Sequence, residues 1–90
     1  DCFAIKDFIP KENFFIICHN ILTNDFFCMP SITFFEKSET IVEDNRDKRI
    51  LSHNSLIKHR WCKNERGLTL LKRALENPRN RISGFLENVA

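Results

Sequence analysis

The apolar residues of this chain concentrate in residues 14–35, which hold six of the nine phenylalanines, two of the four cysteines and a single charged side chain, Asp25. Burial of one phenylalanine contributes roughly 1.5–3 kcal/mol to folding. The three Phe-Phe pairs of this stretch therefore predict that the core is built around it. Asp25 and Pro30 interrupt the stretch, and no apolar run approaches the roughly 20 residues of a membrane span, so no membrane-spanning helix is expected.

The first third of the chain predicts short extended segments. Residues 2–9 mix apolar and polar positions and stop at Pro10, which favours an irregular or extended arm because the residue before a proline avoids helical geometry. Residues 14–22 fit a helix and a buried strand equally well, and a turn is expected at residues 23–25. Residues 26–35 favour a strand that begins just after their proline.

The middle of the chain is highly charged. Residues 36–49 predict an exposed loop, in which only Ile41 and Val42 would suit a short strand. A broken apolar stripe then predicts a helix across residues 47–61, and it consists of Ile50, Ile57 and Trp61.

The end of the chain has a clear helical period. Asn64 suits a helix cap and precedes an apolar stripe of Leu68, Leu71, Ala74 and Leu75. Asn77-Pro78 suits an N-cap followed by proline at the first helical position. Helical spacing continues through Ile82, Phe85, Leu86 and Val89. The last 26 residues are therefore expected to be helical, with a break at Pro78.

This order of elements predicts an α+β fold, in which a small antiparallel sheet from the apolar N-terminal half is packed by C-terminal helices. An all-α single domain is the alternative if residues 14–22 are helical. At 90 residues the chain is one domain, 1–90. Its parts are an apolar arm with the core segments (1–35), a charged loop (36–49) and a basic helical half (50–90).

Charge divides the chain sharply. Residues 1–45 carry three lysines against eight carboxylates, a net charge of −5, whereas residues 46–90 carry eleven lysines and arginines against four carboxylates, a net charge of +7. A basic half indicates an anionic partner, either nucleic acid, sulfated polysaccharide or a membrane surface, unless it is simply a solvated helical face. The candidate polyanion-binding residues are Lys58, His59, Arg60, Lys63, Arg66, Lys72 and Arg73, followed by Arg79 and Arg81.

Catalytic and metal motifs are missing from the sequence. With only Gly67 and Gly84 no glycine-rich phosphate loop can form, and neither a nucleophile elbow nor an HExxH motif occurs. A zinc site could combine Cys18, Cys28, His59 and Cys62, but nine residues separate the first two, whereas structural zinc sites place a ligand pair within two to four residues. We therefore expect no enzyme, no metal site and no cofactor.

Four cysteines allow two readings. They could form two disulfides, with three pairings open, as in a secreted protein. In a reducing compartment, Cys18 and Cys28 would instead serve as small buried hydrophobes.

The landmarks of the chain, taken in order, resemble those of CC chemokines. Cys2-Phe3-Ala4 is similar to the second cysteine of that family with its aromatic neighbour, and Ile9-Pro10-Lys11 is similar to the N-loop. Cys28-Met29-Pro30 with Ser31–Lys37 resembles the third cysteine and the second strand. Cys62-Lys63-Asn64-Glu65, followed by Leu68, Leu71 and Leu75, resembles the fourth cysteine and the C-terminal helix.

The sequence also departs from the family. Asp1 stands where the family has its first cysteine, Cys18 has no counterpart, and the interval from Cys28 to Cys62 is roughly twice that of the family. The resemblance implies a disulfide between Cys2 and Cys62, which leaves Cys28 for Cys18. Such bridges typically stabilise a protein by about 2–4 kcal/mol each.

The resemblance implies a secreted ligand, or an antagonist, that binds a G-protein-coupled receptor and glycosaminoglycans. The positions that match the receptor-binding residues are Asp1, Phe3, Lys6, Phe8 and Lys11. Because a single residue precedes Cys2, a blocking or scavenging ligand is expected rather than a strong agonist. The alternative function is an intracellular helical domain that binds proteins or nucleic acid.

Overall fold

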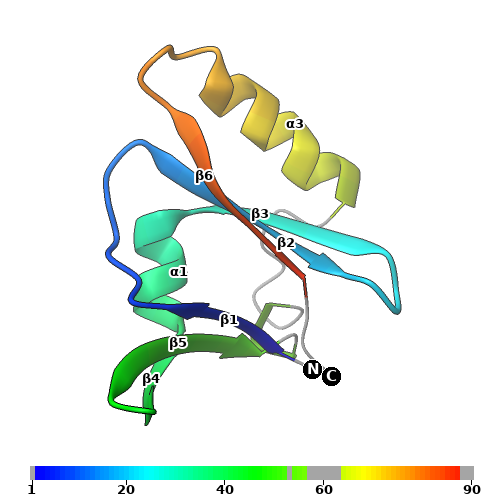
Figure 1. Ribbon diagram of the computed structural model, residues 1–90. Helices are drawn as coiled ribbons and strands as arrows, with labels where there is room; N and C mark the ends of the chain where they lie inside the picture. Colours follow the sequence, from blue (N-terminus) through cyan, green and yellow to red (C-terminus); the bar gives the residue numbers. More distant parts are fainter. Residues whose placement is uncertain (1, 53, 57–63, 88–90) are drawn as a thin grey trace.

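The computed structural model of the protein describes residues 2–52, 54–56 and 64–87. Two three-stranded sheets pack face to face, one helix lies at the end of this sandwich, and another covers the outer face of one sheet (Figure 1). The fold class is therefore α+β, as the order of apolar and helical segments predicts, and the all-α alternative is wrong.

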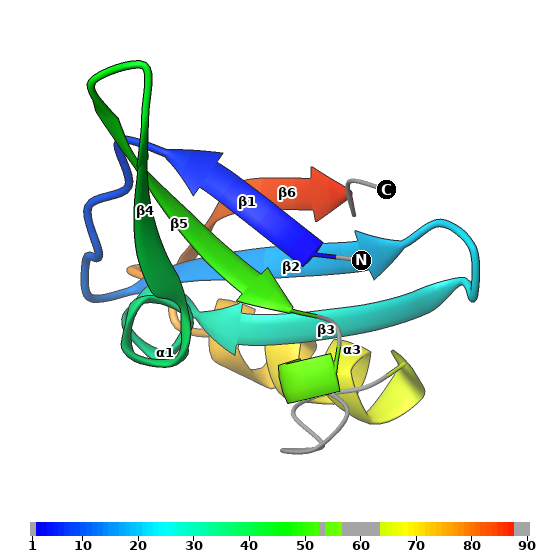
Figure 2. The ribbon, with the colours of Figure 1, turned by 90° about the horizontal axis from the view of Figure 1, so that it is seen from below.

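The first sheet is antiparallel and has the strand order β1-β5-β4. Its strands are β1 (Cys2–Lys6), β4 (Glu39–Glu43) and β5 (Arg46–Ser52). β4 and β5 form a hairpin closed by Asp44 and Asn45, whose φ angles of 53° and 63° are both positive. Two such residues are typical of a type I′ turn, whose twist matches that of paired strands. The tip of this hairpin extends beyond the second sheet (Figure 2).

The second sheet has the strand order β3-β2-β6. β2 (Phe14–Asn20) and β3 (Asp25–Pro30) form an antiparallel hairpin, and β6 (Arg81–Glu87) pairs with β2 in parallel. The turn between β2 and β3 covers residues 21–24. The buried Asn20 side chain holds it, because its Oδ1 accepts the backbone N–H groups of Leu22 (3.0 Å) and Thr23 (3.3 Å).

The core lies between the two sheets. Side chains alternate along a strand, so Ile16 and Cys18 of β2 face the same side as Phe27 of β3. They meet Phe3 of β1 and Leu51 of β5, and Phe3 contacts Phe27 edge to face with ring centroids 6.4 Å apart. Of the eight core residues in the described chain, five belong to residues 14–35, which confirms the position predicted for the core.

Helix α1 (Ser31–Lys37) closes one end of the sandwich. Phe34 is fully buried and contacts Phe8 edge to face, with centroids 5.4 Å apart. The buried Ser31 hydroxyl accepts the Lys11 backbone N–H (3.0 Å) and donates to the Lys11 carbonyl (2.7 Å). The linker from β1 to β2 is thereby attached to the start of the helix.

Helix α3 (Asn64–Leu75) begins at the predicted cap residue. It packs against β3 on the face of the second sheet that points away from the core (Figure 1). Gly67 and Leu71 are buried at this contact. Their spacing of four residues places them on one face of the helix.

Two predictions for the first half need correction. Residues 31–35 are not a strand but belong to α1, because Ser31 and Phe34, three residues apart, are both buried on one helical face. β3 ends at Pro30 instead of starting after it. The extended reading of residues 2–9 holds for Cys2–Lys6, which form a full strand of the first sheet.

The predicted charged loop 36–49 is wrong except that Ile41 and Val42 do belong to a strand, and the predicted helix 47–61 is wrong for residues 47–52. Residues 54–56 are helical, and residues 53 and 57–61 lie outside the described residues. β4 and β5 occupy residues 39–52, where the ladder to β1 places Leu51 opposite Phe3 in the core. The charged side chains of these strands tolerate this arrangement because one face of an antiparallel sheet can remain in water.

The end of the chain differs from the prediction as well. α3 ends at Leu75, and residues 81–87 form β6 instead of a second helix. A strand here completes the second sheet, and Leu86 packs against the core. The apolar residues of this segment suit both periods, so only the pairing with β2 decides between them.

The type I′ turn generates a test of the β4–β5 hairpin. Asn45→Gly is expected to raise the free energy of unfolding by about 0.5 kcal/mol, because glycine adopts positive φ without a steric penalty. Asn45→Val is expected to lower it by about 1 kcal/mol or more. Urea denaturation measures both changes, and a glycine variant less stable than the valine variant would contradict the turn type.

Candidate functional site

Exposed cations follow one another from α3 into the loop and strand after it. Arg66, Lys72 and Arg73 of the predicted polyanion-binding set are exposed on α3, and Arg79 and Arg81 are exposed beyond it. Within the described chain none of these five forms an ion pair, whereas Lys48 and Glu43 do, at 3.2 Å. The predicted residues Lys58, His59, Arg60 and Lys63 lie outside the described residues.

The way in which α3 sits on the sheet exposes these cations. Gly67 and Leu71 face the sheet, so residues one position away from them are turned toward its flanks or toward water. Lys72 and Arg73 also belong to the last turn, where a positive charge interacts favourably with the helix dipole. Against the five cations stand Glu65 and Glu76, which gives residues 64–81 a net charge of +3.

An aromatic cluster lies on the outer face of the second sheet. The His19 ring stacks on Phe26 with centroids 4.2 Å apart and an interplanar angle of 8°. The ring of Phe85 in β6 lies near the His19 ring, with centroids 6.1 Å apart and an interplanar angle of 50°. A contact of 2.9 Å between His19 Nε2 and Asn24 Oδ1 fixes the orientation of the imidazole. We call His19, Phe26 and Phe85 the aromatic cluster.

No pattern in the sequence indicates this cluster. Phe26 lies in the apolar stretch 14–35, and the spacing around Phe85 predicts a helix, so neither pattern links the two residues. A local signal was available in Ser83-Gly84, because glycine and serine weaken a helix interior. Phe85 comes near His19 because β6 pairs with β2, with Phe85 in register with Ile17, and this pairing has no counterpart in the local sequence pattern.

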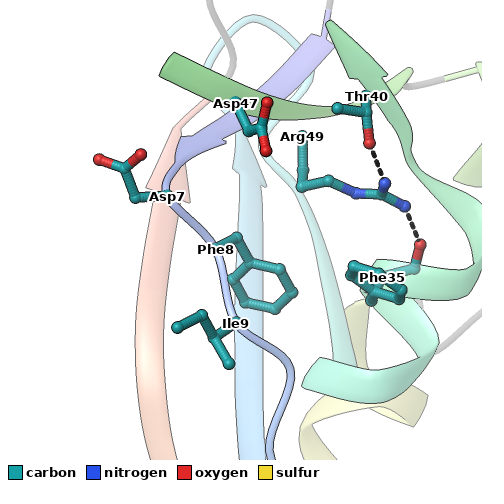
Figure 3. A pocket seen from close by; sticks show the side chains of 7 residues that line it. All are labelled: Asp7, Phe8, Ile9, Phe35, Thr40, Asp47 and Arg49. Atoms are coloured by element: carbon teal, nitrogen blue, oxygen red, sulfur yellow. Dashed lines mark hydrogen bonds between the residues drawn. The ribbon is translucent and has the colours of Figure 1, made fainter. Parts of the chain in front are cut away.

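A pocket of about 360 Å³ lies between the first sheet and the end of α1 (Figure 3). Its lining residues come from the β1–β2 linker, α1, β4 and β5, and they are Asp7, Phe8, Ile9, Phe35, Thr40, Asp47 and Arg49. Arg49 lies across the Phe35 ring, with the guanidinium carbon 4.1 Å from the ring centroid. This geometry gives a cation–π contact.

The Arg49 guanidinium donates its hydrogen bonds to acceptors of the protein. Its Nε donates to Ser38 Oγ (3.0 Å) and one Nη donates to the Ser38 carbonyl (2.9 Å). Further N–H groups donate to the Phe35 carbonyl and to Thr40 Oγ1, the two bonds drawn in Figure 3. Since Phe35 and Ser38 lie at the C-terminal end of α1, Arg49 caps that helix and ties it to β4 and β5.

The two carboxylates of the pocket do not pair with this guanidinium. The Asp7 backbone N–H donates to the Asp47 carbonyl (2.9 Å), which joins the end of β1 to β5. The Asp7 side chain points away from Arg49 in Figure 3. We therefore interpret the Arg49 pocket as a structural junction rather than a binding site for an anion.

The structure separates the residues predicted to contact a receptor. Phe3 is fully buried in the core, where it is not accessible to a receptor in this structure. Lys6 and Lys11 are exposed, and they line a second pocket of about 270 Å³ together with the half-buried Phe8. Asp1 lies outside the described residues.

The structure does not contain the disulfide proposed between Cys18 and Cys28. Cys18 pairs in register with Phe27, and Cys28 with Ile17, so the two cysteine side chains project from opposite faces of the sheet. Burial raises the pKa of the Cys18 thiol, and the nearby Cys28 raises it further. Cys2 is a half-buried free thiol, and its implied partner Cys62 lies outside the described residues.

No group of three or more His, Cys, Asp or Glu side chains within residues 2–52, 54–56 and 64–87 is arranged to hold a metal ion. None of the helices described is both long and apolar enough to cross a membrane. No family model matches the chain, and neither the curated proteins nor the solved structures contain a significant match.

The Arg49 junction predicts a marked loss of stability in Arg49→Lys. We expect the free energy of unfolding to fall by about 2 kcal/mol, because lysine keeps the charge but cannot reproduce the planar set of donors. Arg46→Lys, on an exposed position of the same strand, is the matched control and should change stability by less than about 0.5 kcal/mol. Denaturant unfolding measures both, and equal effects would contradict the junction.

The buried Cys18 thiol predicts a loss of stability at alkaline pH. An unfolded thiol ionises near pH ~8.5, whereas burial keeps Cys18 neutral in the folded protein. The contribution of the neutral Cys18 thiol to the free energy of unfolding is therefore fully present below that pH and falls by about 1.4 kcal/mol per pH unit above it. Unfolding curves across this range should show a shallower decline for Cys18→Ala than for the wild type. Equal slopes would show that Cys18 does not hold a buried neutral thiol.

Proposed function

We propose that this protein is a polyanion-binding domain whose contact surface is centred on α3. The observation that supports the proposal is the set of exposed cations, Arg66, Lys72, Arg73, Arg79 and Arg81, none of which is paired with a carboxylate of the described chain. Cations that serve mainly to stabilise a fold are commonly paired or hydrogen-bonded, as Arg49 is here.

The arrangement suits an extended anion better than a small one. Arg66 and Arg73 lie seven residues apart on α3, which corresponds to about 10 Å along a helix axis. A single exposed ion pair contributes only about 0–1 kcal/mol, so a useful affinity needs several contacts at once. A polymer that presents charges at regular intervals supplies them.

The resemblance to CC chemokines remains a proposal for the wider identity. In that case the polymer would be a sulfated polysaccharide, and Lys6, Phe8 and Lys11 would contact a receptor outside the cell. Cys18 and Cys28 are free thiols in the structure, so the disulfide implied by the resemblance does not support the chemokine-like identity. The alkaline unfolding experiment also bears on this identity, because a bridged Cys18 would have no thiol to titrate.

The proposed surface is tested by removing its charge. The triple variant Arg66→Gln, Lys72→Gln, Arg73→Gln is expected to bind fluorescein-labelled heparin at least about tenfold more weakly than the wild type. For a single-stranded oligonucleotide, the slope of log affinity against log salt should fall in magnitude by about 2, since each phosphate contact contributes about 0.7.

A matched variant separates a defined surface from the general effect of charge. Lys6→Gln, Arg46→Gln, Lys48→Gln removes the same number of cations from the first sheet, and we expect it to retain most of the binding. Fluorescence anisotropy at several salt concentrations measures both variants. Equal losses in the two triple variants would contradict a binding surface on α3.

A further inference from the structure

We infer that the polyanion is a single-stranded nucleic acid, and that one of its bases stacks on the aromatic cluster. This inference rests on the proposed function, because the cations of α3 would hold the phosphate backbone. It gives a role to His19, Phe26 and Phe85, which take no part in binding through the cations alone.

The aromatic cluster and α3 lie on the same face of the second sheet. Phe15 and His19 are four residues apart on β2 and therefore point to the same side. Phe15 and Cys28 line an apolar cavity of about 220 Å³ together with Leu70 and Leu71 of α3. α3 thus covers part of the face that carries the aromatic cluster, and its exposed cations lie on this helix.

The helix leaves the β6 side of this face uncovered. α3 packs against β3, whereas Phe85 and Ile82 of β6 are 55% and 46% exposed. β6 pairs with β2 alone among the described strands, so it forms the edge of the sheet. The exposed Phe85 ring, tilted by 50° to the His19 ring, offers one aromatic face on which a base can stack.

Contacts within the protein hold the His19 and Phe26 rings of the cluster in place. His19 is fixed from one side by the nearly parallel Phe26 ring and at its edge by Asn24. Binding then loses little side-chain entropy, and base stacking on aromatic side chains contributes about 1–3 kcal/mol per base.

Chemical complementarity favours single strands over the other polyanions. A sulfated polysaccharide has no aromatic ring to stack, and the bases of a duplex are already stacked on one another. A single strand combines exposed bases with regular phosphates, which matches a cation-rich helix beside an aromatic sheet face. Glu87 pairs in register with His19 and places one carboxylate at the edge of the aromatic cluster, where it would repel a nearby phosphate.

The test uses fluorescein-labelled oligouridylate of about 12 nucleotides, a length within the footprint of small single-strand-binding folds. Phe85→Leu keeps the apolar character of the side chain but removes its ring, and Phe85→Trp keeps an aromatic ring. We expect Phe85→Leu to weaken oligouridylate binding about 5- to 100-fold. Phe85→Trp should bind within about threefold of the wild type, and both variants should bind heparin within about twofold of it. Glu87→Gln should tighten oligouridylate binding about twofold.

The outcomes separate this inference from the proposed function. Loss of RNA binding in Phe85→Leu, with heparin binding retained, supports stacking on the aromatic cluster. A wild-type protein that binds heparin but not oligouridylate overturns the inference and leaves the proposed function standing, and so does a Phe85→Leu variant that binds RNA normally. An unchanged affinity in Glu87→Gln also overturns it, because it would place the strand away from the aromatic cluster. A wild-type protein that binds neither probe overturns both proposals.

Discussion

Strand β2 organises the molecule because it is hydrogen-bonded on both edges and covered, at least in part, on both faces. β3 pairs with one edge in antiparallel fashion and β6 with the other in parallel. Its inward side chains, Ile16 and Cys18, complete the core against the first sheet. Its outward side chains include His19, the centre of the aromatic cluster. A shift of one residue in the register of β2 would exchange these two sets, so core and outer face are specified together.

The two helices are attached to this framework in different ways. α1 is held by specific polar contacts at both ends, with Ser31 bonded to Lys11 at its start and Arg49 bonded to its last carbonyl groups. α3 rests on β3 through the buried faces of Gly67 and Leu71, with an apolar cavity beside Leu71. Asn80 Nδ2 donates to the Ala74 carbonyl near the end of α3 (2.7 Å). The outer surface of α3 carries cations that are unpaired within the described chain.

Charge and aromatic surface are combined on one side of the protein. Arg49 shows what a structural cation looks like in this fold, since most of its N–H groups donate to protein acceptors. The cations of α3 differ because they have no carboxylate partner in the described chain. On the outer face of the second sheet, Phe85 exposes an aromatic ring on an edge strand. This contrast is the physical reason for seeking the function on the outer face of the second sheet rather than in the Arg49 pocket.

Features that depend on neighbouring residues can be predicted from the amino-acid sequence. The high content of phenylalanine predicts the core in residues 14–35. The apolar stripe that includes Leu71 predicts α3, and the cations of this helix lie outside the stripe. Other features depend on contacts between segments that are distant in the sequence. Residues 81–87 form a strand because they pair with the edge of β2 that β3 does not occupy. Residues 31–37 form a helix because this conformation buries both Ser31 and Phe34 at the end of the sandwich. The pairing of the strands also places Cys18 and Cys28 on opposite faces and brings Phe85 near His19. Pairings between distant segments leave no periodic trace in either segment alone, so they emerge only when the sheets assemble.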